Sequence, residues 1–126
     1  MSTILLDTDI VVDLLRGKVP IRNRIDEILM NGIALSVTPI TLAEIHSGIR
    51  RGEEETVRQF FDSVRNLSIE SSMGKRAGEY LRLYGKSHGV RLADALIAAT
   101  ASVLQIMLFT MNRKHYPMKD VDLYPS

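Results

Sequence analysis

The 126-residue chain contains no cysteine, which excludes disulfide bridges and thiolate metal sites. It also lacks an excess of either charge, because sixteen Lys and Arg balance fifteen Asp and Glu to a formal net charge of +1. This balance does not indicate a particular partner. The length favours a single domain over residues 1–126, and 45% hydrophobic residues are typical of a packed globular core. The absence of cysteine suits the reducing cytoplasm, where we expect the protein to reside.

We expect no segment to enter a membrane. The amino terminus has no basic stretch ahead of its short apolar run, unlike an export signal. Residues 92–111 are mostly apolar and about as long as a membrane span, but they include Asp94 and Gln105 and change character half-way. We interpret them as a buried helix that runs into a buried strand.

Short apolar segments alternate with segments of helical periodicity along the chain. The predicted strands are 4–6, 34–37, 67–69 and 106–109, with a further edge strand at 121–124. The predicted helices are 8–15, 22–30, 39–49, 53–66, 73–84 and 92–103. Strands separated by helices predict an α/β fold with a central parallel sheet flanked by helices.

Asp7 directly follows the first predicted strand. Sites in open parallel sheets form outside the carboxyl ends of the strands, so Asp7 is a candidate for chemistry. The alternative is that Asp7 or Asp9 merely caps the following helix. Asp9 is the better candidate for the cap, which leaves Asp7 available for function.

Two further carboxylates have both a structural and a functional interpretation. Glu44 lies inside the helix that begins after Thr38, and Thr41 with Glu44 fits a capping box, although Thr38 and Pro39 already mark a helix start. Asp94 begins the most apolar segment, where an uncompensated carboxylate costs several kcal/mol. Asp94 therefore either accepts hydrogen bonds at the helix start or faces a cation.

Thr110 and Asn112 follow the strand predicted at 106–109, so they belong to the same edge of the sheet as Asp7. Asn112 offers a neutral oxygen to a metal ion or its water, although asparagine is also a common turn residue. Asp7, Glu44, Asp94 and Asn112 together form a set of hard oxygen ligands that favours Mg²⁺ or Mn²⁺ over zinc.

Other charged residues fit simpler interpretations. His46 and His88 lack the spacing of a zinc site, and we interpret them as surface residues. Arginines such as Arg16 and the pair Arg50 and Arg51 could contact phosphate, but clusters of this kind usually form a solvated face.

Four segments together resemble PIN-domain ribonucleases of the VapC toxin type. They are the Asp-Thr opening at 5–17, the Thr-Pro…Glu segment at 36–45, the Asp-led helix at 92–101 and the closing segment at 109–116. Each is weak alone, but their order and spacing over nearly the whole chain make the set specific.

The resemblance implies a PIN fold and a Mg²⁺- or Mn²⁺-dependent endoribonuclease that hydrolyses RNA. It carries Asp7, Glu44 and Asp94 over as catalytic metal-binding carboxylates, which the Thr8 and Thr110 hydroxyls would orient. It also implies a homodimer and a VapB-like antitoxin. If the three carboxylates converge, their repulsion should raise at least one pKa in the absence of metal.

Two alternatives remain at this point. Many family members place an aspartate at the position of Asn112 or three residues later, at His115, so the chain could be a catalytically degenerate PIN binding module. The Asp7-Thr8-Asp9 opening also resembles phosphatases of the haloacid dehalogenase type, although the paired acids that should follow residues 106–109 are missing.

Overall fold

The computed structural model describes residues 2–125 and has the predicted parallel sheet. Its strands are β1 (Thr3–Leu6), β2 (Ala34–Val37), β3 (Arg65–Asn66) and β4 (Met107–Phe109), in the order β3-β2-β1-β4. Every neighbouring pair is parallel. The helices are α1 (Thr8–Leu15), α2 (Val19–Met30), α3 (Pro39–Ser47), α4 (Glu54–Ser63), α5 (Ser71–Tyr84) and α6 (Leu92–Leu104), followed by a 3₁₀ turn, η1 (Arg113–His115). The α/β prediction is confirmed.

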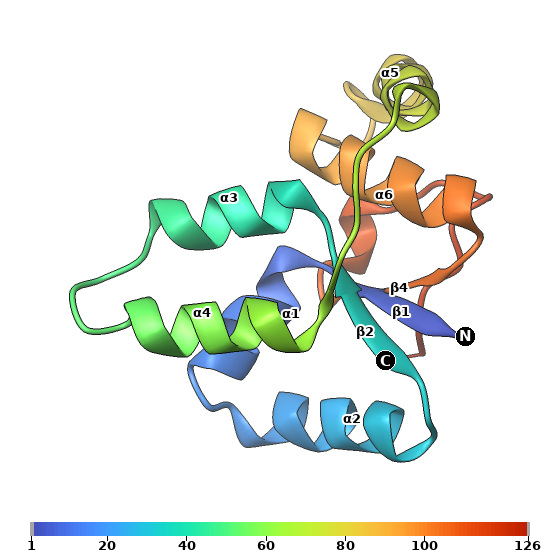
Figure 1. The fold of residues 1–126 in the computed structure, drawn as a ribbon. Coiled ribbons are helices and arrows are strands. Elements are labelled where there is room, and N and C mark those ends of the chain that lie inside the picture. The colour runs from blue at the N-terminus through green and yellow to red at the C-terminus, as the bar shows by residue number, and fades with distance from the viewer. Residues whose placement is uncertain (1, 126) are drawn as a thin grey trace.

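Helices cover both faces of the sheet, because side chains alternate along each buried strand. Leu5 points into one core with α5 and α6, whereas Ile4 and Leu6 point into a second core with α1, α2 and α4. In Figure 1, α5 lies over α6, and α3 and α4 form a hairpin that projects from the body of the molecule. The sheet thus separates two apolar cores, and its carboxyl edge faces the start of α1 and of α3.

The third strand is displaced from its predicted place. The helix predicted over 53–66 ends at Ser63, and the strand predicted at 67–69 is instead Arg65–Asn66. Arg65 pairs with Ser36 and Asn66 with Val37 of β2. The pairing with β2 imposes extended backbone where the periodicity of the sequence alone indicates helix.

Two other expectations change at the ends of elements. The edge strand predicted at 121–124 is reduced to one parallel bridge between Leu108 and Leu123. The helix predicted from residue 22 begins at Val19, with Pro20 in its first turn. Residues 92–111 do form a helix and then a strand, and no helix among residues 2–125 is long and apolar enough to cross a membrane.

Candidate active site at the carboxyl edge of the sheet

Asp7 and Thr110 meet where two neighbouring strands end. Asp7 follows β1 and Thr110 follows β4, and the Asp7 backbone N–H donates to the Phe109 carbonyl at 2.9 Å. Parallel strands end at the same edge of a sheet, so this placement follows from the topology that the sequence predicts.

The Asp7 carboxylate is held by two donors and is only 7% exposed. One oxygen accepts from the Thr8 backbone N–H and the other from the Thr110 hydroxyl, both at 2.8 Å. Asp7 also occupies the N-cap position of α1. The prediction that Asp9 caps this helix was therefore wrong, since Asp9 lies in its first turn and accepts from the Met111 N–H at 3.0 Å.

Burial and a neighbouring carboxylate raise the free-energy cost of ionising the carboxyl groups at this edge. Burial, followed by the charge of Asp9, raises the pKa of Asp7 from 3.8 to about 6. Burial also raises the pKa of Asp9. The expected cause, repulsion among Asp7, Glu44 and Asp94, does not account for the raised pKa of Asp7, because burial is the main cause and the contributing carboxylate is Asp9.

Glu44 joins this edge through a chain of hydroxyls. The Thr8 hydroxyl donates to Glu44 Oε1 at 2.6 Å and lies 2.9 Å from the Thr41 hydroxyl. Because a carboxylate only accepts, the Thr8 proton is committed to Glu44, and Thr41 donates to Thr8. The Thr38 hydroxyl accepts from the Ile40 N–H and caps α3, as predicted. Glu44 itself is exposed, so one carboxylate oxygen remains open to a ligand.

Asp94 combines the two interpretations that the sequence leaves open. It is the third residue of α6, and its Oδ2 accepts from the Arg91 N–H at 3.2 Å, as in a capping box. The same oxygen lies 3.7 Å from His115 Nδ1, and the side chain is 18% exposed. Asp94 thus supports the helix start while facing the closing segment of the chain.

Asn112 contacts His115, and its nitrogen is the contacting atom. Its Nδ2 lies 2.7 Å from His115 Nδ1, so the amide donates and the imidazole accepts. The sequence suggested that Asn112 offers an oxygen to a metal. In the structure the amide nitrogen orients His115 beside Asp94, and the Oδ1 atom expected to face a metal takes no part in this contact.

Tyr116 is a site residue that the sequence analysis did not single out. Its hydroxyl is buried and has no hydrogen-bond partner of good geometry among residues 2–125. Burial, followed by the charges of Asp7 and Asp94, raises its pKa. The Tyr116 hydroxyl therefore lies close enough to Asp7 and Asp94 for the charges of both carboxylates to act on it. An aromatic residue just after Asn112 and His115 was the only signal in the sequence.

A divalent cation fits the donors of this edge, although not as a closed cage. No group of three His, Asp or Glu side chains within residues 2–125 is close enough to hold a metal ion, so the expected convergence of Asp7, Glu44 and Asp94 in one coordination shell is absent. Mg²⁺ commonly uses one or two carboxylates and completes its shell with water. The oxygen-only donors and the unpartnered Tyr116 hydroxyl suit a hydrated ion of this kind.

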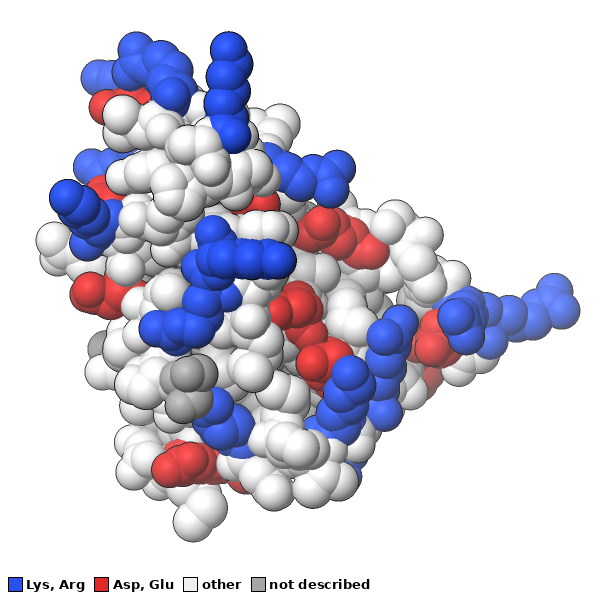
Figure 2. All heavy atoms as spheres, turned by 180° about the vertical axis from the view of Figure 1, so that it is seen from behind, with Lys and Arg blue, Asp and Glu red and all other residues white. Residues whose placement is uncertain are grey.

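One face of the molecule has a mixed charge pattern. Figure 2 shows acidic side chains gathered near the middle of one face, with basic side chains on both sides. His46 and His88 are exposed and contact the rings of Phe61 and Tyr84, in line with the interpretation that they are surface residues.

Comparison with known proteins decides the family. A family model described as PIN domain matches residues 4–122. The chain belongs to the PIN-domain family. This membership confirms the resemblance seen in the sequence and the predicted fold, and it sets aside the haloacid dehalogenase alternative.

Among PIN-domain relatives, Ribonuclease VapC10 of Mycobacterium tuberculosis is 35% identical over 116 residues, which cover 91% of this chain and 86% of that protein. Ribonuclease VapC19 of the same organism is 34% identical over 115 residues, covering 90% of this chain and 92% of that protein. A solved toxin–antitoxin complex from Klebsiella pneumoniae has the same fold, with a TM-score of 0.77 and 24% identity over 93% of each chain.

Proposed function

We propose that this PIN-domain protein is an endoribonuclease that depends on Mg²⁺ or Mn²⁺ and acts as the toxin of a toxin–antitoxin pair. The observation that carries the proposal is the identity of about one third with two ribonucleases over nine tenths of the chain. The carboxylates at the edge of the sheet supply the chemistry that such an activity needs. RNA cleavage by a toxin also agrees with the expected cytoplasmic location.

Asp7 and Asp94 are the proposed metal ligands. When bound, the ion would polarise a phosphate oxygen of the RNA and position the attacking water. Thr110 and the Thr8 N–H hold the Asp7 carboxylate in one orientation, and the Arg91 N–H holds Asp94. Such outer hydrogen bonds fix the direction in which a ligand presents its free lone pairs.

Glu44 is the proposed proton acceptor. The Thr8 hydroxyl occupies Oε1, and the exposed side chain leaves the other oxygen accessible. That oxygen can bind the attacking water and receive its proton. Glu44 would therefore act on the substrate side as a base, while Asp7 and Asp94 would hold the ion.

The activity is tested with purified protein and a structured RNA in Mn²⁺. We expect cleavage that EDTA abolishes and that Asp7→Asn abolishes at equal folded concentration. An uncut RNA that is nevertheless bound would favour the degenerate PIN module. Sequencing the new RNA ends identifies the cleavage site.

A VapB-like antitoxin is the proposed partner, supported by the fold shared with a chain of a solved toxin–antitoxin complex. An antitoxin arginine would suit the crowded carboxylates around Asp7 by bidentate hydrogen bonding. We expect growth arrest when the chain is expressed alone, relief by Asp7→Asn, and rescue by co-expression of the neighbouring gene product. The homodimer implied by the family is tested by sedimentation of the purified chain with and without that product.

A further inference from the structure

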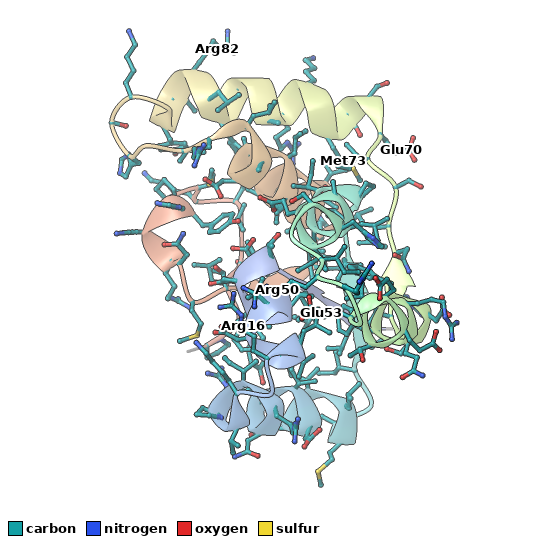
Figure 3. The ribbon with its side chains drawn as sticks, turned by 90° about the vertical axis from the view of Figure 1, so that its left-hand side faces the viewer. Arg16, Arg50, Glu53, Glu70, Met73 and Arg82 are labelled. Carbon is teal, nitrogen blue, oxygen red and sulfur yellow. The ribbon has the colours of Figure 1, made fainter. Side chains whose placement is uncertain are left out.

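A groove of about 420 Å³ opens beside Glu44, between α1, α3 and the turn that leads to α4. Apolar side chains of these helices, among them Val12, Ile45 and Val57, form part of its lining. Arg16 and Arg50 also line it. Figure 3 shows these two labelled arginines near one another, with Glu53 beside them.

Neither arginine has a structural task for its guanidinium. Both residues are exposed, and neither side chain has a hydrogen-bond or ion-pair partner within residues 2–125. Two other basic residues of this region are paired, whereas Arg51 also has no side-chain partner within residues 2–125. Lys18 pairs with Asp13 at 3.2 Å, and Arg58 of α4 is held between Glu55 and Asp62. The two groove arginines are therefore free to bind an anionic ligand.

The turn that carries Arg50 is ordered before any ligand binds. The Arg50 N–H donates to Glu53 Oε1 at 2.7 Å, and the Glu53 N–H donates back to the Arg50 carbonyl at 3.0 Å. Gly52 permits the turn with a φ of +92°. These reciprocal bonds fix the backbone at Arg50, which lowers the entropy cost of using its side chain for recognition.

We propose that this groove binds the backbone of single-stranded RNA, with Arg16 and Arg50 contacting phosphates next to the one that is cut. The proposal rests on the proposed ribonuclease function. A guanidinium matches the geometry of a phosphate and binds it through two parallel hydrogen bonds. An RNA strand that lies in the groove passes Glu44, the proposed proton acceptor, because Glu44 is one of the residues that line the groove.

The dimensions of the groove favour a single strand over a duplex. Its volume is in the range of small-ligand pockets, roughly 300–1,000 Å³. A short stretch of unpaired nucleotides fits such a space, and the apolar wall can contact sugars and bases. The two glutamates in the lining do not cancel this preference, because Glu53 accepts from the Arg50 N–H and Glu44 accepts from the Thr8 hydroxyl.

The test measures RNA binding in EDTA, where metal-dependent cleavage cannot occur. A fluorescein-labelled single-stranded RNA is titrated with wild type, Arg16→Glu, Arg50→Glu and the double variant at several salt concentrations. The matched control is Arg82→Glu, which changes the net charge equally. Arg82 is exposed, has no partner within residues 2–125 and lies on α5, far from the groove in Figure 3.

We expect each groove variant to lose affinity several-fold and the double variant to lose on the order of tenfold or more. The slope of log affinity against log salt should fall by about 0.7 for each lost phosphate contact. Arg82→Glu should bind like wild type. Glu53→Gln keeps an oxygen acceptor for the Arg50 N–H and removes a negative charge, so it should bind RNA more tightly.

Equal affinities for the groove variants and Arg82→Glu would overturn the proposal, whether or not the wild type cuts RNA in Mn²⁺. The proposal would also fail if the groove variants bound RNA normally and lost only the antitoxin, because the groove would then be a protein-binding site. Selective loss of RNA binding in a protein that cuts no RNA would support the groove and refute the ribonuclease function.

Discussion

The Thr110 hydroxyl donates a 2.8 Å hydrogen bond to Asp7 Oδ2, although the two residues are 103 positions apart. The same hydroxyl oxygen accepts from the Asn112 N–H at 3.0 Å. One buried hydroxyl thus links the end of β1, the end of β4 and the closing segment. The orientation of the candidate metal ligand therefore depends on the segment that follows β4, near the end of the sequence.

Replacing Thr110 should impair both stability and catalysis. Thr110→Val keeps the shape but leaves Asp7 Oδ2 and the Asn112 N–H without a partner, at a cost of about 1–3 kcal/mol of unfolding free energy. We expect kcat to fall about 10- to 100-fold, because the Asp7 carboxylate loses its orientation. Urea unfolding and RNA cleavage in Mn²⁺ measure the two effects. Thr110→Ser retains the hydroxyl and should recover most of both, and an inactive Ser variant would contradict this role.

Asp7→Asn should stabilise the metal-free protein at neutral pH. The pKa of Asp7 rises from 3.8 to about 6 in the folded state, so its contribution to stability is present below pH 4 and is lost as the pH rises to 6. That rise corresponds to roughly 3 kcal/mol, an upper limit on the gain from asparagine.

Thermal melts in EDTA at pH 4 and pH 7 measure this difference. The melting temperature of Asp7→Asn should exceed that of wild type by several degrees at pH 7 and by much less at pH 4. Titrating groups far from Asp7 affect both proteins alike and cancel in the comparison, whereas the repulsion between Asp9 and Asp7 is lost in the variant and contributes to its gain at pH 7. A gap that stays constant with pH would show that Asp7 ionises freely in the folded protein.

Asp7 and Thr110 show which parts of the site the sequence can predict and which it cannot. The position of Asp7 after a buried strand predicted its place at the carboxyl edge, because parallel topology determines where strands end. The hydrogen bond that Asp7 accepts from Thr110 could not be predicted, because the two residues are 103 positions apart and no local pattern indicates that they are in contact. Helix-capping rules favoured Asp9 as the cap of α1. In the structure the Asp9 carboxylate instead accepts a hydrogen bond from the Met111 N–H.

The displaced β3 shows the same limit for the fold. Helical spacing from Val57 to Val64 continues past the real helix end, and only the open edge of β2 explains why Arg65 and Asn66 extend. Strand pairing of this kind is non-local, so a local pattern does not contain it. The longest elements, α5 and α6, were predicted within two residues because their apolar periodicity is strong.

Asn112→Ala should leave metal affinity unchanged. In the structure the amide nitrogen of Asn112 faces His115 Nδ1, so we assign the side chain to orienting the imidazole and expect Asp7 and Asp94 to hold the ion. Calorimetric titration with Mn²⁺ should give the same dissociation constant for Asn112→Ala, for wild type and for Asn23→Ala, an exposed control on α2. A tenfold loss confined to Asn112→Ala would restore Asn112 as a ligand.

Asp94→Asn separates a metal ligand from a helix cap. Asparagine can still accept from the Arg91 N–H, so in EDTA the variant should melt within about a degree or two of wild type. In Mn²⁺ at 100 times the dissociation constant, wild type gains about 2.7 kcal/mol, which raises the melting temperature of a domain of this size by several degrees. Asp94→Asn should gain much less, because one of the two proposed carboxylate ligands is gone. Asp26→Asn, an exposed α2 residue, serves as the control and should shift like wild type. If Mn²⁺ raises the melting temperatures of all three proteins equally, Asp94 only stabilises the start of α6. The ion would then bind to Asp7 without a contribution from Asp94.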